Sequence, residues 1–226
     1  MMYDLYLGDR LFSSGSLRGW LMFEKFGVPY REHMMGLYAG TLAQDMAELA
    51  PARTVPAAKT PEGYILSDSL SMAETLAERH PDAGLWPSDP AARALARNLV
   101  CEMHSGFGAL RDVCNMQISH VWEGFIAPEP VLKNLERIEF LWAMARERHG
   151  AKGPWLFGEY SLADVFYAPV AMRITGYGLP VSDAAKAYVE NHLNDPAFLR
   201  WRAEALKEDH KTFPYEMNLP RKDWPF

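Results

Sequence analysis

The stretch PDAGLWPSDPAARA at residues 81–94 constrains the fold more than any other feature of this sequence, because the pattern of the chain changes there. Before it, short alternating runs typical of strands are interspersed with helical patterns. After it, only helical patterns remain. The prolines and glycine of this stretch are typical of a connector between two units. The sequence therefore predicts a small α/β domain followed by an all-α domain.

The first eighty residues predict short strands and helices in turn. Tyr3–Leu7 alternates apolar and polar residues, as a half-buried strand does. Apolar residues at helical spacing from Leu17 to Phe26 predict a helix that ends at Gly27, just before a proline. We further expect a strand at 30–33, a helix at 41–49, short strands within 54–59 and 63–68, and a helix containing Leu70, Ala73 and Leu76.

After the connector, Asp89 and Pro90 suit the start of a long helix. Apolar residues then recur at steps of three or four and predict one continuous inward stripe, made by Leu95, Leu99, Met103, Phe107, Leu110 and Cys114. Further helices are expected at 129–149, 161–175, 183–192 and 196–208. SLAD at 161–164 matches a capping box with Asp164 at its third helical position, and Pro169 predicts a kink in that helix.

Composition excludes several classes of protein. The chain has 226 residues, 49% of them hydrophobic and 23% charged, which is typical of soluble globular proteins. A net charge of -6, with no local cluster of Lys and Arg, argues against a nucleic-acid partner. No apolar run approaches the roughly 20 residues of a membrane span, and the N-terminus has no signal-peptide pattern. We expect a cytoplasmic protein that spans no membrane.

The two cysteines, Cys101 and Cys114, are 13 residues apart in the predicted long helix. At that separation they are too distant to form a disulfide, and their spacing does not suit metal ligands. We therefore expect no metal site.

The stretch LFSSGSLRGW at 11–20 places Ser13, Ser14 and Ser16 where a helix begins. Capping the exposed N–H groups is the ordinary role of such serines. A hydroxyl at the positive end of the helix dipole also suits donation to a bound anion, and a thiolate is such an anion. Such an interaction lowers the pKa of a thiol.

The stretch TVPAA at 54–58 places Pro56 at the start of a strand. Most such prolines are trans and structural. A cis bond before Pro56 would turn the N–H and C=O of Val55 outward, where they are free to pair with a peptide-like ligand. The sequence leaves both interpretations open.

The stretch LSDSLSMAETL at 66–76 offers Asp68 or Ser69 as the N-cap of a helix. The same geometry suits an amino-acid head group. Its carboxylate would lie at the helix N-terminus beside the Ser69 hydroxyl, and its ammonium would pair with Asp68.

The order of these motifs resembles that of the glutathione transferase superfamily, over nearly the whole chain. SSGSLRGWL is similar to the SSxSxR start of the serine-type classes, TVP to the Val–cis-Pro step, and SDSLSMAETL to the glutathione-binding helix. EMHSGFGALR and SLADVFYAPVAMRITGYGL resemble segments of a bacterial subgroup whose members usually begin SSWSLRPWL. The serine motif also resembles that of the zeta-class, or maleylacetoacetate isomerase, type.

The resemblance implies a thioredoxin-like glutathione-binding domain at 1–82, a linker at 83–88 and an all-α domain at 89–226. It also implies a homodimer that uses glutathione as co-substrate and no metal.

The resemblance further implies a role for each matched residue. Ser13 would donate a hydrogen bond to the glutathione thiolate, with Ser14 as the reserve candidate. Val55, ahead of cis-Pro56, would pair with the cysteinyl unit, while Asp68 and Ser69 would bind the γ-glutamyl ammonium and carboxylate.

The activity so implied is a glutathione transferase with a detoxification role, whose thiolate attacks a small hydrophobic electrophile. The expected pocket residues are Phe12, Met103, His104, Phe107 and Arg111. Two alternatives stay open: a glutathione-dependent cis–trans isomerase of the maleylacetoacetate type, and a non-catalytic glutathione- or ligand-binding protein. Thiol–disulfide exchange at the serine motif is excluded, because the Cys-x-x-Cys frame of related redox proteins is serine here.

Two features depart from the subgroup. Gly15 and Gly19 replace its usual Trp and Pro, and we expect them to remove bulk beside the thiol site and loosen the first helical turn. The segment KTFPYEMNLPRKDWPF at 211–226 matches no family pattern. Its aromatic residues would cover the cleft or a neighbouring subunit, or the segment would simply pack on the core or fray.

Overall fold

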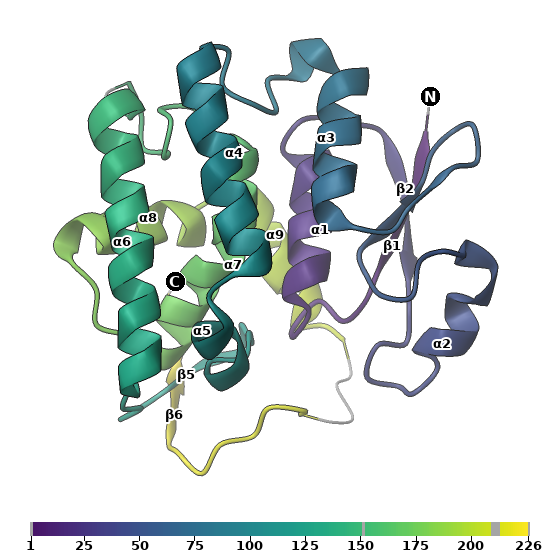
Figure 1. The fold of residues 1–226 in the computed structure, drawn as a ribbon. Helices are drawn as coiled ribbons and strands as arrows, with labels where there is room; N and C mark the ends of the chain where they lie inside the picture. Colours follow the sequence, from purple (N-terminus) through teal and green to yellow (C-terminus); the bar gives the residue numbers. More distant parts are fainter. Residues whose placement is uncertain (1, 151, 209–212, 226) are drawn as a thin grey trace.

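A four-stranded sheet forms the N-terminal domain of the computed structural model, which describes residues 2–150, 152–208 and 213–225 (Figure 1). The strands are β1 (Tyr3–Leu7), β2 (Tyr30–Met34), β3 (Ala57–Lys59) and β4 (Ile65–Leu66), in the order β2-β1-β3-β4. β1 is parallel to β2 and antiparallel to β3, and β3 and β4 form a hairpin. This mixed sheet confirms the predicted thioredoxin-like α/β domain.

Three helices accompany the sheet: α1 (Ser14–Glu24), α2 (Leu42–Asp45) and α3 (Ser69–Arg79). Every residue of α1 from 16 to 23 is buried, because the sheet covers one side of α1 and the helical domain covers the other. The helix expected at 41–49 is instead α2 followed by the 3₁₀ turn Ala47–Leu49. A second 3₁₀ turn, Pro81–Ala83, lies in the connector.

The helical domain contains α4 (Pro90–Ser105), α5 (Gly108–Val113), α6 (Glu129–His149), α7 (Leu162–Tyr177), α8 (Asp183–Leu193) and α9 (Pro196–Ala205). Helix α7 is buried on nearly all sides and packs against α1, α4 and α8. The two domains therefore share one hydrophobic cluster. Helix α7 is continuous through Pro169, and its predicted capping box is present at Ser161 and Asp164.

The prediction of a single long helix after residue 90 is wrong, because the helix is interrupted between α4 and α5. Gly106 is extended, and Phe107 has a φ of 57°, which is left-handed. An ideal Cβ on Gly106 would lie 2.6 Å from the Glu102 carbonyl oxygen, so glycine suits this exit. The apolar pattern of the sequence runs on across this interruption because α4 and α5 both turn their apolar residues toward the same core. Cys101 is exposed on α4, whereas Cys114 is buried at the end of α5.

A two-stranded ribbon adds to the otherwise helical domain. β5 (His120–Trp122) pairs antiparallel with β6 (Arg221–Asp223), so the expectation of no strands in this part of the chain is wrong. Strands of three residues carry too little alternation to be recognised in a sequence. Of the segment 211–226, residues 211, 212 and 226 lie outside the described residues. The remainder packs on the helical domain and reaches the N-terminal domain.

Among the described residues, no helix is both long and apolar enough to cross a membrane.

Candidate functional site

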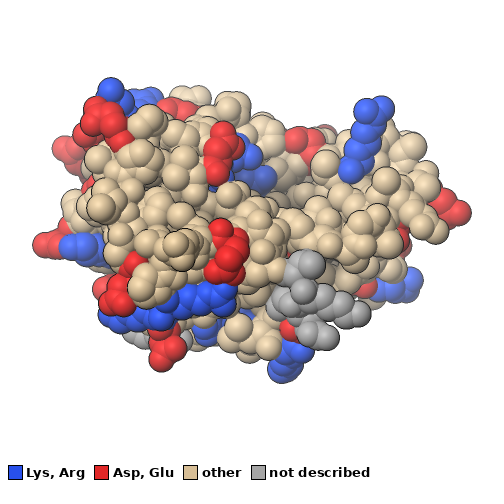
Figure 2. Space-filling model, turned by 90° about the horizontal axis from the view of Figure 1, so that it is seen from below, with Lys and Arg blue, Asp and Glu red and all other residues tan. Residues whose placement is uncertain are grey.

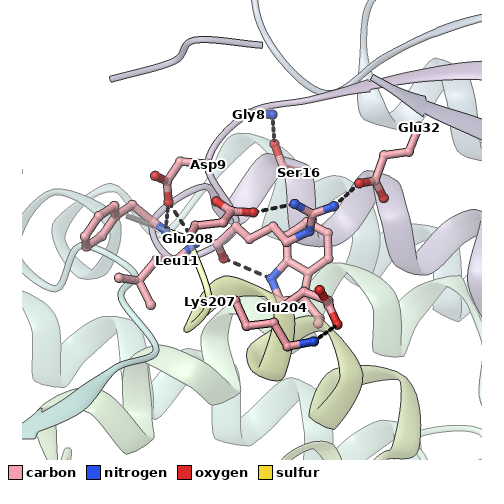
Figure 3. Close-up of polar contacts among 11 residues, drawn as sticks. Gly8, Asp9, Leu11, Ser16, Glu32, Glu204, Lys207 and Glu208 are labelled. Carbon is pink, nitrogen blue, oxygen red and sulfur yellow. Dashed lines mark hydrogen bonds and ion pairs between the residues drawn. The ribbon is translucent and has the colours of Figure 1, made fainter. Parts of the chain in front are cut away.

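The loop between β1 and α1, which carries the serines, is held by its own hydrogen bonds (Figure 3). One carboxylate oxygen of Asp9 accepts from the backbone N–H groups of Leu11 and Phe12, at 2.7 and 3.0 Å. The Gly8 N–H donates to the Ser16 hydroxyl at 2.7 Å. The backbone leading into α1 is therefore fixed locally.

The same loop is also tied to distant parts of the chain through Arg10. Its guanidinium pairs with Glu32 of β2 and with Glu208, which follows α9. The Arg10 carbonyl accepts from the indole N–H of Trp201 at 2.9 Å. Both domains therefore hold the loop, and the serine side chains begin from a preorganised backbone.

Ser13 is the N-cap of α1. Its Oγ accepts from the Ser16 N–H at 3.1 Å and donates to the Ser16 Oγ at 2.8 Å. Ser13 is only 6% exposed. A hydroxyl has one proton, so this contact uses the only donor that Ser13 has.

Ser14 is the first residue of α1 and is half-buried. Its Oγ is 3.4 Å from Nη2 of Arg173 on α7, from which it accepts a weak hydrogen bond. Its own proton is donated to no side chain or carbonyl in the described part of the chain. Of the two serines, Ser14 therefore has the proton available to a ligand.

The turn before β3 presents unpaired backbone groups beside these serines. The bond between Val55 and Pro56 is cis, the geometry that the functional interpretation of TVPAA requires. Within the described segments, the N–H and C=O of Val55 make no backbone hydrogen bond. Both groups are free to pair with an extended ligand.

Gly15 and Gly19 do not open space at the site, so the expectation that they remove bulk beside the thiol is wrong. An ideal Cβ on Gly15 would lie 2.8 Å from the Val55 carbonyl oxygen. One on Gly19 would lie 2.4 Å from Cβ of Pro56. The absence of a side chain at these positions lets α1 pack directly on the Val55–Pro56 turn.

Asp68 is the N-cap of α3, accepting from the N–H groups of Leu70 and Ser71 at 2.8 and 3.2 Å. Its other carboxylate oxygen is 3.2 Å from Nε2 of His104 on α4. Ser69, the first residue of α3, is buried. The start of α3 thus joins the two domains through a carboxylate that is half-exposed to solvent.

The remaining predicted pocket residues fall into two groups. Met103 is 1% exposed and Phe107 is also buried, so both side chains belong to the core. His104 and Arg111 are partly exposed, and Nη1 of Arg111 donates to the His104 carbonyl at 3.1 Å. Phe12 is buried beneath the C-terminal segment.

That segment forms an aromatic cluster with Phe12. The rings of Phe213 and Tyr215 meet the Phe12 ring edge-on, with centres 4.8 and 5.9 Å away. Tyr38 contacts Phe12 as well, and its hydroxyl is hydrogen-bonded to that of Tyr215. Phe213 also packs on His120 of β5. The segment therefore packs against both domains next to the serine loop.

Sequence reasoning missed two buried arginines beside Ser14. Arg18 lies one turn further along α1, is 8% exposed, and places its guanidinium over the Phe166 ring. Its Nε has no hydrogen-bond partner, and no carboxylate of the described chain forms an ion pair with it. Burial and the nearby charges of Arg111 and Arg173 lower the pKa of Arg18 to about 10.

Arg173 is 5% exposed and comes from the C-terminal half of α7. Its Nε donates to the Cys114 carbonyl at 2.8 Å and its Nη1 to the Pro169 carbonyl at 3.2 Å. Burial and the charge of Arg111 lower its pKa to about 10. The sequence did contain a signal for Arg173, since it is the one arginine in an otherwise almost wholly apolar helix.

Basic side chains are visible at the edge of a hollow near the middle of the face seen in Figure 2. In the described ranges, no three His, Cys, Asp or Glu residues are grouped to hold a metal ion.

Comparison with known proteins agrees with this fold. Residues 12–79 match the family model described as Glutathione S-transferase, N-terminal domain. A probable maleylacetoacetate isomerase of Caenorhabditis elegans is 28% identical over 160 residues, which cover 69% of this chain and 72% of that protein.

Solved structures have the same overall fold. A glutathione transferase homologue from Burkholderia gl BGR1 with bound glutathione has a TM-score of 0.67 at 22% identity, covering 92% of this chain and 100% of that one. A diazinon-metabolizing glutathione S-transferase of the silkworm Bombyx mori has a TM-score of 0.70 at 19% identity, covering 92% and 98%. The fold is that of these glutathione transferases, and the N-terminal part of the chain matches the model of their N-terminal domain.

Proposed function

We propose that this chain is a glutathione transferase in which the Ser14 hydroxyl donates a hydrogen bond to the glutathione thiolate. The observation that carries the proposal is that the two serines make different hydrogen bonds. Ser13 uses its proton to cap α1, whereas Ser14 keeps its proton and lies beside Arg173. The matching family model and the neighbour with bound glutathione support glutathione as the co-substrate.

Glutathione would be held by the groups that flank Ser14. The free N–H and C=O of Val55 would pair with its cysteinyl unit as an added strand does. Its γ-glutamyl carboxylate would lie at the N-terminus of α3 beside Ser69, and its ammonium would pair with Asp68. Asp68 is exposed enough to exchange its contact with His104 for this ammonium.

The chemistry is activation of a thiol by a neutral donor and nearby positive charge. The hydroxyl and the dipole of α1 stabilise the thiolate, so the thiol releases its proton to solvent at a lower pH. Each unit by which the pKa falls corresponds to about 1.4 kcal/mol of preferential stabilisation of the thiolate. The thiolate then attacks an electrophilic carbon, forming a C–S bond as the leaving group departs with the electron pair.

A second candidate is a glutathione-dependent cis–trans isomerase, which the relative named as a maleylacetoacetate isomerase favours. There the thiolate adds to a cis double bond, the resulting single bond rotates, and the C–S bond breaks to give the trans product and the same thiolate. A glutathione-binding protein without turnover is the third possibility.

Thiolate absorbance near 240 nm tests the proposal. We expect enzyme-bound glutathione to have a lowered thiol pKa and Ser14→Ala to raise it by about one unit or more. Ser13→Ala should leave that pKa unchanged while costing about 1 kcal/mol of stability through loss of the cap. Ser105→Ala, at an exposed serine on α4, serves as the matched control. A pKa that responds to Ser13→Ala and not to Ser14→Ala would reverse the assignment.

Turnover separates the three functions. Conjugation of an aryl halide supports the transferase, and rapid isomerisation of maleylacetone supports the isomerase. Retention on immobilised glutathione without either reaction supports the binding protein.

We also propose that the protein is a cytoplasmic homodimer with a glutathione-binding domain at 1–82, a linker at 83–88 and a helical domain at 89–226. Light scattering of the purified protein measures the oligomeric state.

A further inference from the structure

The helix start at Ser14 lies beside more buried positive charge than the protein itself neutralises. Arg18 is nine-tenths buried, its Nε has no partner, and no carboxylate in the described ranges forms an ion pair with it. A buried charge without a partner is costly, and proteins ordinarily supply one. An unpaired guanidinium in this position therefore indicates that its partner is a ligand.

Arg18 is not isolated, since Arg111 and Arg173 carry like charges that act on it. Arg173 reaches Ser14 through Nη2 while its other nitrogens are fixed by carbonyls. Arg111 extends from α5, anchored through one nitrogen to the His104 carbonyl. The like charges of the three residues lie close enough to disfavour one another. Only Asp68 among the described carboxylates acts favourably on Arg18, and that carboxylate is occupied by His104 and by capping α3.

Three arginines exceed what a thiolate requires. A thiolate is a single sulfur atom, for which the Ser14 hydroxyl and the helix dipole already provide stabilisation. Guanidinium groups match the planar, two-oxygen geometry of a carboxylate through paired N–H donors. Arg173 reaches Ser14 itself, and Arg18 lies one turn further along the same helix, close to where the second substrate must approach the sulfur.

We propose that Arg18, Arg111 and Arg173 form a binding site for a carboxylate on the electrophilic substrate. This inference rests on the proposed function, and it narrows the expected hydrophobic electrophile to an anionic one. The carbon skeleton of such a substrate would lie toward the partly exposed ring of Tyr215, which packs on Phe12.

A matched pair of aryl chlorides tests the site: 4-chloro-3-nitrobenzoate and the uncharged 4-chloro-3-nitrobenzamide. In both, the thiolate attacks the carbon that bears chlorine, a C–S bond forms, and chloride leaves with the electron pair of the broken C–Cl bond. We expect the wild-type protein to have at least about tenfold higher kcat/KM for the carboxylate. A hydrogen bond between charged groups typically changes binding by roughly 10- to 150-fold.

Arg18→Met and Arg111→Met should each lower the ratio of kcat/KM for carboxylate over amide by about tenfold or more. Arg111 is partly exposed, so its variant tests the site at a position less deeply buried than Arg18. Arg137→Met, which removes an exposed arginine paired with Glu102, is the matched control and should leave the ratio unchanged.

Calorimetry gives a second readout that needs no turnover. With S-methylglutathione present, 3-nitrobenzoate should bind the wild-type protein at least tenfold more tightly than 3-nitrobenzamide, and the arginine variants should lose this difference. Equal binding of the two probes by the wild-type protein would overturn the proposal. So would variants that raise the thiol pKa while the substrate ratio stays fixed, since the arginines would then serve the thiolate. A wild-type protein that forms no thiolate refutes the proposed function instead, and the calorimetric comparison still decides on the carboxylate site.

Discussion

Asp164 and Arg18 are both buried charges, and the protein surrounds them in opposite ways. Asp164, which is 0% exposed, accepts from the Leu156 N–H, the Ser161 N–H and hydroxyl, and the Tyr188 hydroxyl, at 2.9 to 3.1 Å. Arg18 has the face of Phe166 and, among the residues that the structure describes, no carboxylate paired with it. A charge that the chain satisfies itself supports the fold, whereas one it leaves unsatisfied points to a ligand.

The comparison also separates two helix starts that look alike in sequence. SLAD at the start of α7 and SSGS at the start of α1 each begin with a serine N-cap. At α7 the polar groups of Ser161 and Asp164 bind one another, whereas at α1 the Ser14 hydroxyl keeps a proton for a ligand. The two helix N-termini differ because different parts of the fold pack against them.

The largest expected effect is loss of stability on removing the satisfied charge. Asp164→Ala leaves several buried donors without an acceptor and should lower the free energy of unfolding by about 3–5 kcal/mol. Urea unfolding measures the change. Asp183→Ala, at a fully exposed carboxylate in the first turn of α8, should cost far less, because solvent screens its ion pair with Lys186. Similar losses in the two variants would remove the distinction.

Gly19→Ala tests whether the helix that carries Arg18 is fixed by its contact with Pro56. Alanine normally stabilises a helix relative to glycine by up to about 1 kcal/mol. Here the added Cβ would lie 2.4 Å from Pro56, so we expect a net loss of about 1–3 kcal/mol in urea unfolding. A gain in stability would show that α1 can move away from the Val55–Pro56 turn without loss of unfolding free energy.

The pH dependence of stability sharpens the account of Asp164. Burial raises the pKa of this carboxyl to about 6, although hydrogen bonds from Leu156 and Ser161 partly oppose that shift. Between about pH 4 and 6 the folded protein therefore holds a proton that the unfolded chain has released. Raising the pH through this window should weaken the fold by up to about 1.4 kcal/mol per pH unit from this group.

Asp164→Asn removes this titration, so the difference in unfolding free energy between wild type and variant should change with pH across that window. The difference is expected to be flat above about pH 6.5. A constant difference at every pH would show that Asp164 is ionised throughout.

The smallest expected effect is on stability when the unsatisfied charge is removed. Arg18→Met leaves no hydrogen-bond partner unpaired, so the free energy of unfolding should fall by less than about 1 kcal/mol or increase. Arg173→Met should cost more, because the Cys114 and Pro169 carbonyls lose their donor. Thermal unfolding of both variants without ligand measures the contrast. A large loss in Arg18→Met would assign that arginine to the fold.

The local signals in the sequence were sufficient for much of the fold. Helix α6 begins and ends as predicted at 129–149, because a regular apolar period and flanking breakers lie within the same segment. The capping box of Ser161 and Asp164 was also predicted, because it depends on atoms within three residues of each other.

The sequence was insufficient where one pattern is compatible with two backbones. The stripe from Met103 to Leu110 suits a continuous helix as well as two helices that bury the same side. The break at Gly106 and Phe107 depends on how α4 and α5 pack on α6 and α7. Likewise, β5 and β6 exist through pairing with each other, far apart along the chain.

The sequence by itself determined the order of the motifs and the residue types that surround the predicted thiol site. Only the tertiary structure decided which serine keeps its proton and which arginine lacks a partner. Arg173 meets Ser14 across 159 positions of sequence, and Asp68 meets His104 from another domain. The physical reason is that capping is settled by neighbours along the chain, whereas the neutralisation of a buried charge is settled by whatever the fold brings beside it.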